Sequence, residues 1–160
     1  MNILIISDTH GRHGNLEKVL EKEKDLDLLI HLGDLEQGED YIQALVNCKV
    51  EFVAGNNDYF SSLPYSKVLE IEGTKILITH GHTYYISVDT TMLEEEAKKL
   101  EVDIVMFGHT HIPMLEVKDN IVLLNPGSIS LPRQSNKKPS YITMKLVENM
   151  LPKYEICYLD

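Results

Sequence analysis

The chain contains 160 residues, of which 43% are hydrophobic and 25% are charged, and its formal net charge is −10. This composition is ordinary for a globular protein, and the length predicts one domain over residues 1–160. The excess of acidic residues argues against a protein that mainly holds nucleic acid through its phosphates. It does not exclude an enzyme that acts on a phosphate ester, because bound cations would invert the local field.

The cysteines and the apolar runs bear on the compartment of the protein. Cys48 and Cys157 are isolated and form no CxxC motif, which favours a reducing compartment. The sequence opens directly into the apolar run Ile3–Ile6, without a basic leader. No stretch approaches the roughly 20 apolar residues that cross a membrane. We therefore expect a cytoplasmic protein with no membrane contact.

Short apolar runs alternate with amphipathic helical patterns along most of the chain. In chain order, strands are predicted at Ile3–Ile6, Leu28–Ile30, Val50–Val53, Ile76–Ile78, Ile104–Phe107, Met114–Val117, Ile121–Leu124, Tyr141–Leu146 and Tyr154–Leu159. Helices are predicted around Leu16–Leu20, Tyr41–Val46 and Leu93–Leu100, the last opened by a capping-box pair, Thr91 and Glu94. Several strands lack polar alternation, so we expect α/β architecture: mixed sheets with outer helices and a β-rich C-terminal third.

A polar cluster follows most of these strands. The clusters are Ser7-Asp8-Thr9-His10-Gly11, Gly33-Asp34, Gly55-Asn56-Asn57-Asp58, Thr79-His80-Gly81-His82, Gly108-His109-Thr110-His111 and Asn125-Pro126-Gly127-Ser128. In α/β sheets, the carboxyl ends of the strands form the crevice where ligands bind. The six clusters are therefore predicted to converge on one site.

The residue types in these clusters indicate metal chemistry. Asp8 and His10 are two residues apart, as are His109 and His111, and on an extended backbone each pair would point to one side. Carboxylate, imidazole and amide ligands without thiolate suit manganese, iron, zinc or nickel. The seven candidate ligands are Asp8, His10, Asp34, Asn56, His80, His109 and His111. They are too many for one ion but suit two ions about 3.5–4 Å apart, with Asp34 as the bridging carboxylate.

The ordered motifs DxH, GD, GN, HGH and GHxH, between Asp8 and Ser128, resemble the calcineurin-like metallophosphoesterase superfamily, in particular its short, single-domain prokaryotic phosphodiesterases. The resemblance implies a four-layer α/β/β/α sandwich with mixed β-sheets. It also implies two divalent metal ions, for which manganese is our first expectation. Asp8, His10, Asp34 and His111 would hold the first ion, and Asp34, Asn56, His80 and His109 the second. A metal-bridging hydroxide would then attack phosphorus in line.

One position departs from the family pattern. Many superfamily phosphatases have a histidine after the ligand asparagine, and this histidine helps to protonate the leaving group. Asn57 occupies that position here, and an amide cannot supply a proton at neutral pH. We therefore predict a preference for activated esters or diesters, or an alternative donor such as His82. Asp34, Asn57 and His82 are the residues to which we assign catalytic roles.

The leading hypothesis is thus a phosphodiesterase acting on a small diester, such as a nucleotide. The first alternative is a non-catalytic scaffold of the same fold, as in a eukaryotic retromer subunit that resembles the family. A phosphomonoesterase is the second alternative, which Asn57 disfavours. The acidic composition offers no extended track for a nucleic-acid strand. By analogy with relatives, the chain is expected to be able to form a homo-oligomer.

Several other polar residues have both a functional and a structural interpretation. His31 lies in an apolar run and is predicted to be a hydrogen-bonded core residue. Asp58 is predicted to orient its neighbours. Arg12 and His13 could contact a substrate phosphate or lie in a solvated loop. Asn125 and Ser128 could support the site or simply form an NPG turn. The basic loop with Arg133, Lys137 and Lys138 could be solvated or could attract the substrate.

Overall fold

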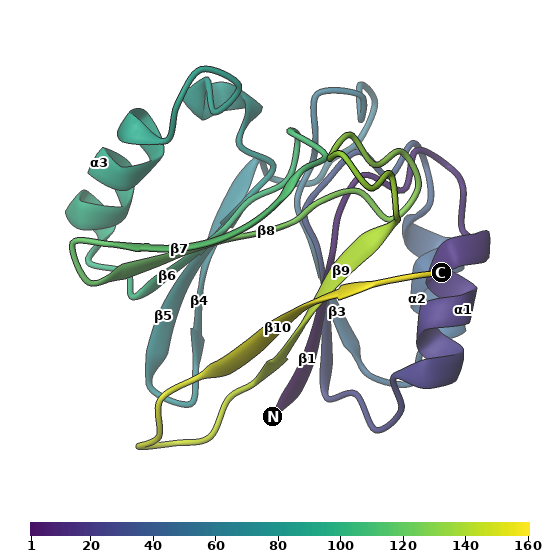
Figure 1. The fold of residues 1–160 in the computed structure, drawn as a ribbon, viewed down its shortest axis with the longest axis horizontal. Coiled ribbons are helices and arrows are strands. Elements are labelled where there is room, and N and C mark those ends of the chain that lie inside the picture. The colour runs from purple at the N-terminus through teal and green to yellow at the C-terminus, as the bar shows by residue number, and fades with distance from the viewer.

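A computed structural model describes all 160 residues and contains two five-stranded sheets with helices outside them (Figure 1). The strands are β1 (Asn2–Ile6), β2 (Leu28–His31), β3 (Lys49–Phe52), β4 (Ser66–Ile71), β5 (Thr74–Thr79), β6 (Ile104–Met106), β7 (Pro113–Lys118), β8 (Ile121–Pro126), β9 (Ser140–Lys145) and β10 (Lys153–Tyr158). The helices are α1 (Gly14–Lys22), α2 (Glu39–Leu45), α3 (Thr91–Leu100) and a 3₁₀ turn, η1 (His82–Tyr84).

Both sheets are mixed, as predicted. The first has the order β10-β9-β1-β2-β3, and the second has the order β4-β5-β6-β8-β7. Three strands of each sheet run parallel: β1, β2 and β3 in the first, and β5, β6 and β8 in the second. The remaining strands pair antiparallel. The carboxyl ends of the parallel strands lead into the loops at the top of Figure 1.

The absence of polar alternation in the strands reflects burial on both faces. In β1, Ile3 and Ile5 belong to the core between the two sheets, whereas Leu4 and Ile6 pack in the core under α1 and α2. A third core lies beneath α3 and includes Phe107. Figure 1 accordingly shows α3 on one side of the paired sheets and α1 and α2 on the other. Since a fully buried aliphatic side chain contributes about 1.5–3 kcal/mol, these three cores hold the four layers together and confirm the predicted α/β/β/α sandwich.

Two local features differ from the sequence-based expectation. Strand β4 was not predicted, because it is an edge strand without buried residues: Leu69 and Ile71 are half-buried, and Val68 is 46% exposed. The capping-box assignment is wrong by one residue, since Thr90 is the N-cap of α3 and Thr91 is the first helical residue. The Thr90 hydroxyl bonds to the Glu94 carboxylate, and the Thr91 N–H donates to Asp89 Oδ1 at 2.9 Å. Side-chain contacts of Thr90 and Asp89 therefore cap the start of α3. A sequence pattern alone does not distinguish these contacts from a capping box that begins at Thr91.

The helices are short, and the longest, α3, has ten residues. None of them has the length and apolar character needed to cross a bilayer.

Candidate dinuclear metal centre

The six predicted polar clusters follow β1, β2, β3, β5, β6 and β8, and the structure brings them to one edge of the two sheets. Contacts between loops of different sheets demonstrate the convergence. His111 Nε2, after β6, lies 3.0 Å from Asp8 Oδ1, after β1. His80 Nε2, after β5, lies 3.5 Å from Asp34 Oδ2, after β2.

One group of side chains has the composition of a metal site. Asp8, His10, Asp34 and His111 each offer a ligand atom, and these four atoms all lie within 4.8 Å of one another. The Nε2 atoms of His10 and His111 are 3.3 Å apart, and His10 Nε2 lies 3.7 Å from Asp34 Oδ2. Asp8, Asp34 and His111 are buried, and His10 is half-buried. The group therefore offers two carboxylates and two imidazoles to one ion.

A second group adjoins the first. Asn56 Oδ1 lies 3.1 Å from His80 Nε2 and 2.8 Å from His109 Nδ1. The Asp34 carboxylate is common to both groups, because its Oδ2 atom is near His10 Nε2 on one side and His80 Nε2 on the other. All seven predicted ligands are thus assembled in one place, with Asp34 between the two groups.

The backbone at five of these ligands is not extended, so the predicted reason why the pairs Asp8/His10 and His109/His111 would each face one side is wrong. Asp8, His10, His109 and His111 have φ values of 57°, 48°, 67° and 60°, and Asp34 has 56°. These left-handed conformations are uncommon for residues other than glycine and cost about 1–3 kcal/mol each. They turn each side chain individually toward the site. Consistent with this, His109 and His111 lie in different groups and do not present two ligands to one side.

Hydrogen bonds to Nδ1 fix the orientation of several imidazoles. His80 Nδ1–H donates to the Leu32 carbonyl and His111 Nδ1–H to the Leu131 carbonyl, both at 2.7 Å. His10 Nδ1 faces Glu36 Oε1, also at 2.7 Å. In a neutral imidazole the other nitrogen then carries a lone pair, so the Nε2 atoms of all three rings are available as metal ligands.

With these tautomers, acceptor atoms of different residues face one another, as expected around a metal ion. The lone pairs of His10 Nε2 and His111 Nε2 face each other at 3.3 Å. Asp8 Oδ1 is buried without a hydrogen-bond donor and faces the lone pair of His111 Nε2 at 3.0 Å. Converging acceptors are unfavourable unless a cation lies between them. A donor set of carboxylate, imidazole and amide oxygen suits first-row divalent ions, so the residues fit the group that the motifs imply.

The charges in the site perturb one another strongly. Burial alone would raise the pKa of Asp8, but the neighbouring His111 and His80 rings hold the pKa below its usual value. For Asp34, burial is likewise outweighed by His80 and by the hydrogen bonds from Asn57, so its pKa is well below the usual range. The two carboxylates in turn raise the pKa of His80 against the effect of burial. Both aspartates are therefore anionic at neutral pH, as metal ligands must be.

The loop after β3 holds Asp34 in place. Asn57 donates to both carboxylate oxygens of Asp34, through its backbone N–H to Oδ1 at 2.9 Å and its side-chain amide to Oδ2 at 2.7 Å. Asp58 accepts three backbone N–H groups at 2.8 Å, those of Asp34, Glu36 and Gly55. Asp58 thus orients its neighbours as predicted, whereas the contact between Asn57 and Asp34 was not anticipated.

Asn125, near the end of β8, and Ser128, in the loop after β8, support the site. The Asn125 amide donates to the Gly108 carbonyl at 2.9 Å, and its Oδ1 accepts the Gly127 N–H at 2.8 Å. The Ser128 hydroxyl donates to the Asp8 carbonyl at 2.9 Å. The two interpretations left open for these residues therefore both hold: they form a turn, and that turn braces the loops that carry Asp8 and His109.

The remaining predicted residues are placed around the centre. His82 lies on η1, half-buried, with its ring centroid 5.5 Å from that of His80, and burial lowers its pKa. His31 is fully buried: its Nδ1 accepts the Gly33 N–H at 3.2 Å, and its Nε2 lies 3.0 Å from the Thr9 hydroxyl, as predicted for a core residue. His13 packs on the Tyr41 ring at 4.7 Å.

The two basic segments lie at the surface. Arg12 and Arg133 are exposed, and Lys138 pairs with Asp160 at 2.8 Å. A residue that the motifs did not single out, Glu36, contacts His10 directly. Its only sequence signal is its position two residues after Asp34.

Two glycines are required for the close approach of the loops that carry Asp34 and Asn56. A Cβ atom on Gly55 would lie 2.1 Å from Asp34 Oδ1, and one on Gly33 would lie 2.7 Å from the Gly55 nitrogen. Such distances are far inside van der Waals contact, so glycine is needed at both positions. The GD and GN motifs thus have a steric basis.

The fold and the site define a metal-dependent phosphoesterase, and comparisons with known proteins agree. Residues 1–149 match the calcineurin-like phosphoesterase superfamily domain, and the chain belongs to this family. It is 40% identical over 134 residues to "Probable metallophosphoesterase YsnB" of Bacillus subtilis, covering 83% of this chain and 78% of that protein. It is 30% identical over 162 residues to "Phosphodiesterase YfcE" of Escherichia coli, covering 85% and 83% of the two chains.

A solved structure from Streptococcus pneumoniae, described as a predicted phosphoesterase, has the same fold. Its TM-score is 0.80 at 30% identity, and the superposition covers 98% of this chain and 97% of that one. The chain is therefore a metal-dependent phosphoric ester hydrolase with an Asp/His metal-binding cluster.

Proposed function

We propose that the protein is a phosphodiesterase that hydrolyses small phosphodiesters at a dinuclear metal centre. The observation that carries the proposal is the position of Asp34, whose Oδ2 atom lies 3.7 Å from His10 Nε2 and 3.5 Å from His80 Nε2. A carboxylate between two sets of acceptor atoms is suited to bridge two ions.

Each residue of the centre has a separate role in this proposal. The first ion would be held by Asp8, His10, Asp34 and His111, and the second by Asp34, Asn56, His80 and His109. Two divalent ions, when bound, would lower the pKa of water to give a hydroxide nucleophile at neutral pH, and would offset charge that develops on the phosphoryl oxygens.

Asn57 keeps the Asp34 carboxylate oriented through its two hydrogen bonds. It cannot donate a proton to the leaving alcohol. His82, beside His80, is the side chain available for that step. Because burial lowers its pKa, the protonated fraction of His82 is small at neutral pH, which supports a preference for activated esters and diesters over monoesters.

We take manganese as the physiological ion, with nickel, zinc or iron as alternatives. A nucleotide is one form that the small diester substrate can take, and we expect no extended nucleic-acid track and no membrane partner. We further propose that residues 1–160 form a single domain and that the protein forms a homo-oligomer. We propose a cytoplasmic location, which the free Cys48 and Cys157 support.

The test is hydrolysis of bis(4-nitrophenyl) phosphate and 4-nitrophenyl phosphate by metal-stripped protein, with Mn²⁺, Ni²⁺, Zn²⁺ or Mg²⁺ added back. We expect diester turnover to be restored by metal and to be lost in Asp34→Asn. Asp25→Asn is a matched control, because Asp25 is exposed and has almost the same backbone φ, 58° against 56°.

Two outcomes contradict the proposal. Monoester turnover that exceeds diester turnover with every metal would make the protein a phosphomonoesterase. Metal binding without turnover of either ester would favour the scaffold alternative.

A further inference from the structure

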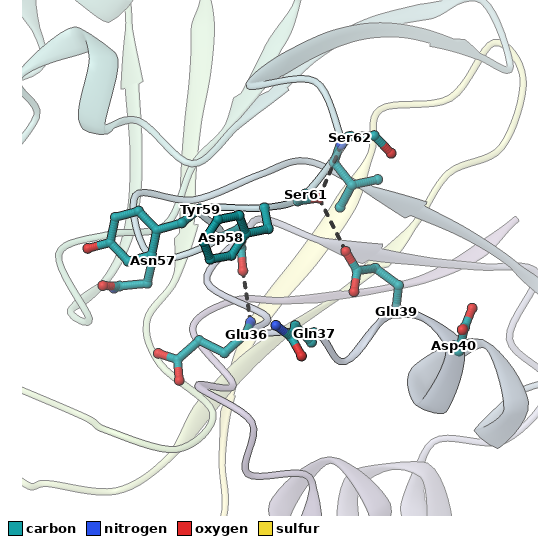
Figure 2. Close-up of a pocket in the computed structure, with 11 residues that line it drawn as sticks. Glu36, Gln37, Glu39, Asp40, Asn57, Asp58, Tyr59, Ser61 and Ser62 are labelled. Atoms are coloured by element: carbon teal, nitrogen blue, oxygen red, sulfur yellow. Dashed lines mark hydrogen bonds between the residues drawn. The ribbon is translucent and has the colours of Figure 1, made fainter.

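A pocket of about 940 Å³ adjoins the metal centre (Figure 2). It is lined by Glu36, Gln37, Glu39, Asp40, Asn57, Asp58, Tyr59, Phe60, Ser61, Ser62 and Leu63. Two of these residues also touch the centre: Asn57 donates to Asp34 Oδ2 at 2.7 Å, and Glu36 Oε1 lies 2.7 Å from His10 Nδ1. A diester whose phosphorus lies at the metal centre therefore has one ester arm within reach of this pocket.

The pocket presents two aromatic side chains to solvent. Tyr59 is 78% exposed and Phe60 is 95% exposed, so both rings are open to a ligand. Their loop is held firmly: the Asp58 N–H donates to the Gly55 carbonyl at 3.3 Å, the Ser61 N–H donates to the Asp58 carbonyl at 3.2 Å, and Asp58 is buried. The loop thus presents an uncovered aromatic surface next to the buried Asp58. Figure 2 places Tyr59 at the same end of the pocket as Asn57.

The charge of the pocket limits what these rings can contact. Four of the lining residues are acidic and none is Lys, Arg or His. Asp58 accepts backbone N–H groups and Glu36 contacts His10. Glu39 accepts a hydrogen bond from the Ser61 hydroxyl at 3.3 Å, and neither Glu39 nor Asp40 has a cation within 4.0 Å. Other carboxylates of the chain, such as Glu51, pair with lysine. A second phosphate on the substrate would be repelled here, whereas a positive charge would be attracted.

We propose that this pocket binds an alkylammonium group on one ester arm of the diester substrate, with Tyr59 and Phe60 against the cation and Glu39 and Asp40 balancing its charge. Aromatic faces combined with carboxylates are the chemistry that recognises quaternary ammonium groups. The inference rests on the proposed function and adds the substrate class. It assigns specificity to the loop after β3 and the start of α2.

Two diesters that differ only in charge test the proposal. They are 4-nitrophenyl phosphorylcholine and 4-nitrophenyl 3,3-dimethylbutyl phosphate, in which carbon replaces the quaternary nitrogen. In both, water oxygen joins phosphorus, the P–O bond to nitrophenol breaks, and nitrophenolate leaves with the electron pair. We expect kcat/KM for the choline ester to be about tenfold higher, the size of a partly desolvated cation–π contact. Equal values for the two esters would overturn the proposal.

Variants locate the effect. The double variant Glu39→Gln/Asp40→Asn should reduce the tenfold preference to near unity, as should Tyr59→Ser/Phe60→Ser. Glu95→Gln/Glu148→Gln makes the same change in net charge at exposed positions outside the pocket and should keep the preference. A preference lost equally in this control would mean that overall charge, not the pocket, selects the substrate, and would overturn the proposal.

Binding to the metal-free protein gives a readout that does not depend on turnover. Tetramethylammonium should shift the backbone amide NMR signals of Tyr59, Phe60 and Ser61, and tert-butanol, its neutral counterpart, should not. If neither bis(4-nitrophenyl) phosphate nor the choline ester is hydrolysed but these shifts occur, the proposed function fails and the cation pocket stands. If the diesters are hydrolysed and no shift occurs, the cation pocket is refuted and the proposed function stands. The same holds if thymidine 5′-(4-nitrophenyl phosphate) is hydrolysed in preference to the choline ester and this preference depends on Tyr59 and Phe60.

Discussion

Asn57 holds both oxygens of the Asp34 carboxylate, with its backbone N–H on Oδ1 at 2.9 Å and its side-chain amide on Oδ2 at 2.7 Å. The same Oδ2 atom faces His10 and His80 and is therefore the atom best placed to bridge two ions. Asn57, which replaces the family's histidine, thus positions the carboxylate that would bridge the ions of the proposed dinuclear centre. Its contribution should be visible in metal binding as well as in turnover.

Asn57→Ala is expected to weaken metal binding. The substitution removes the amide on Oδ2 and leaves the backbone contact to Oδ1, so Asp34 keeps one of its two restraints. Loss of a hydrogen bond that orients a metal ligand typically lowers affinity 10- to 100-fold. Titration calorimetry with Mn²⁺ measures the change, and Asn47→Ala, in an exposed loop, is the control. Unchanged Mn²⁺ affinity in Asn57→Ala would show that the backbone contact alone positions Asp34.

Gly55→Ala is expected to disrupt the proposed dinuclear site. The new Cβ atom would lie 2.1 Å from Asp34 Oδ1 and 2.4 Å from the Asp34 nitrogen, so the carboxylate and its backbone must move. Overpacking of this kind costs about 1–3 kcal/mol of stability. Thermal unfolding and metal content should both fall. Gly14→Ala is the matched control, since its Cβ meets nothing within 4 Å, and it should change neither quantity appreciably. A Gly55→Ala protein with full metal content would contradict the steric argument.

The ligand set was predictable from sequence, but the way it is assembled was not. Polar residues directly after parallel strands meet at one edge of a sheet. Locating the strands in the sequence was therefore enough to predict that Asp8, Asp34 and His80 lie close together. The left-handed backbone at Asp8 and Asp34 cannot be inferred from residue type, because these conformations are imposed by tertiary contacts such as the Asp34 N–H to Asp58 Oδ2 bond. For the same reason, the roles of Glu36 and Asn57 became visible only in the structure.

Turnover should depend on the leaving group. Because Asn57 cannot donate a proton, the rate should fall steeply as the pKa of the leaving alcohol rises, unless His82 supplies a proton. We expect His82→Gln to slow a diester with a poor leaving group about 100-fold more than one with a good leaving group, the usual scale of general acid catalysis. Single-turnover rates for a series of substituted phenyl esters measure this slope. A rate that is independent of leaving-group pKa in both the wild type and His82→Gln would contradict the absence of an acid at position 57.

The stability of the metal-free protein should fall in mild acid because of His31. Burial lowers the pKa of His31 from its ordinary value of 6.5 to about 3, and the ring is satisfied as a neutral tautomer by Gly33 and Thr9. Between these two pKa values the unfolded chain binds a proton at this residue that the folded chain does not. The free energy of unfolding therefore decreases as pH falls through this window, by up to about 1.4 kcal/mol per pH unit from His31 alone.

His31→Gln removes this proton while retaining a polar side chain. Its unfolding free energy is expected to be lower than that of the wild type at pH 7, because an amide fits the imidazole site imperfectly, but to decline less steeply between pH 6 and pH 4.5. Urea unfolding in the presence of a chelator at each pH measures both slopes. His13→Gln serves as the control, since His13 is only half-buried and a smaller change in slope is expected. Parallel curves for wild type and His31→Gln would mean that His31 is protonated in the folded protein, and its bond from the Gly33 N–H could not then form.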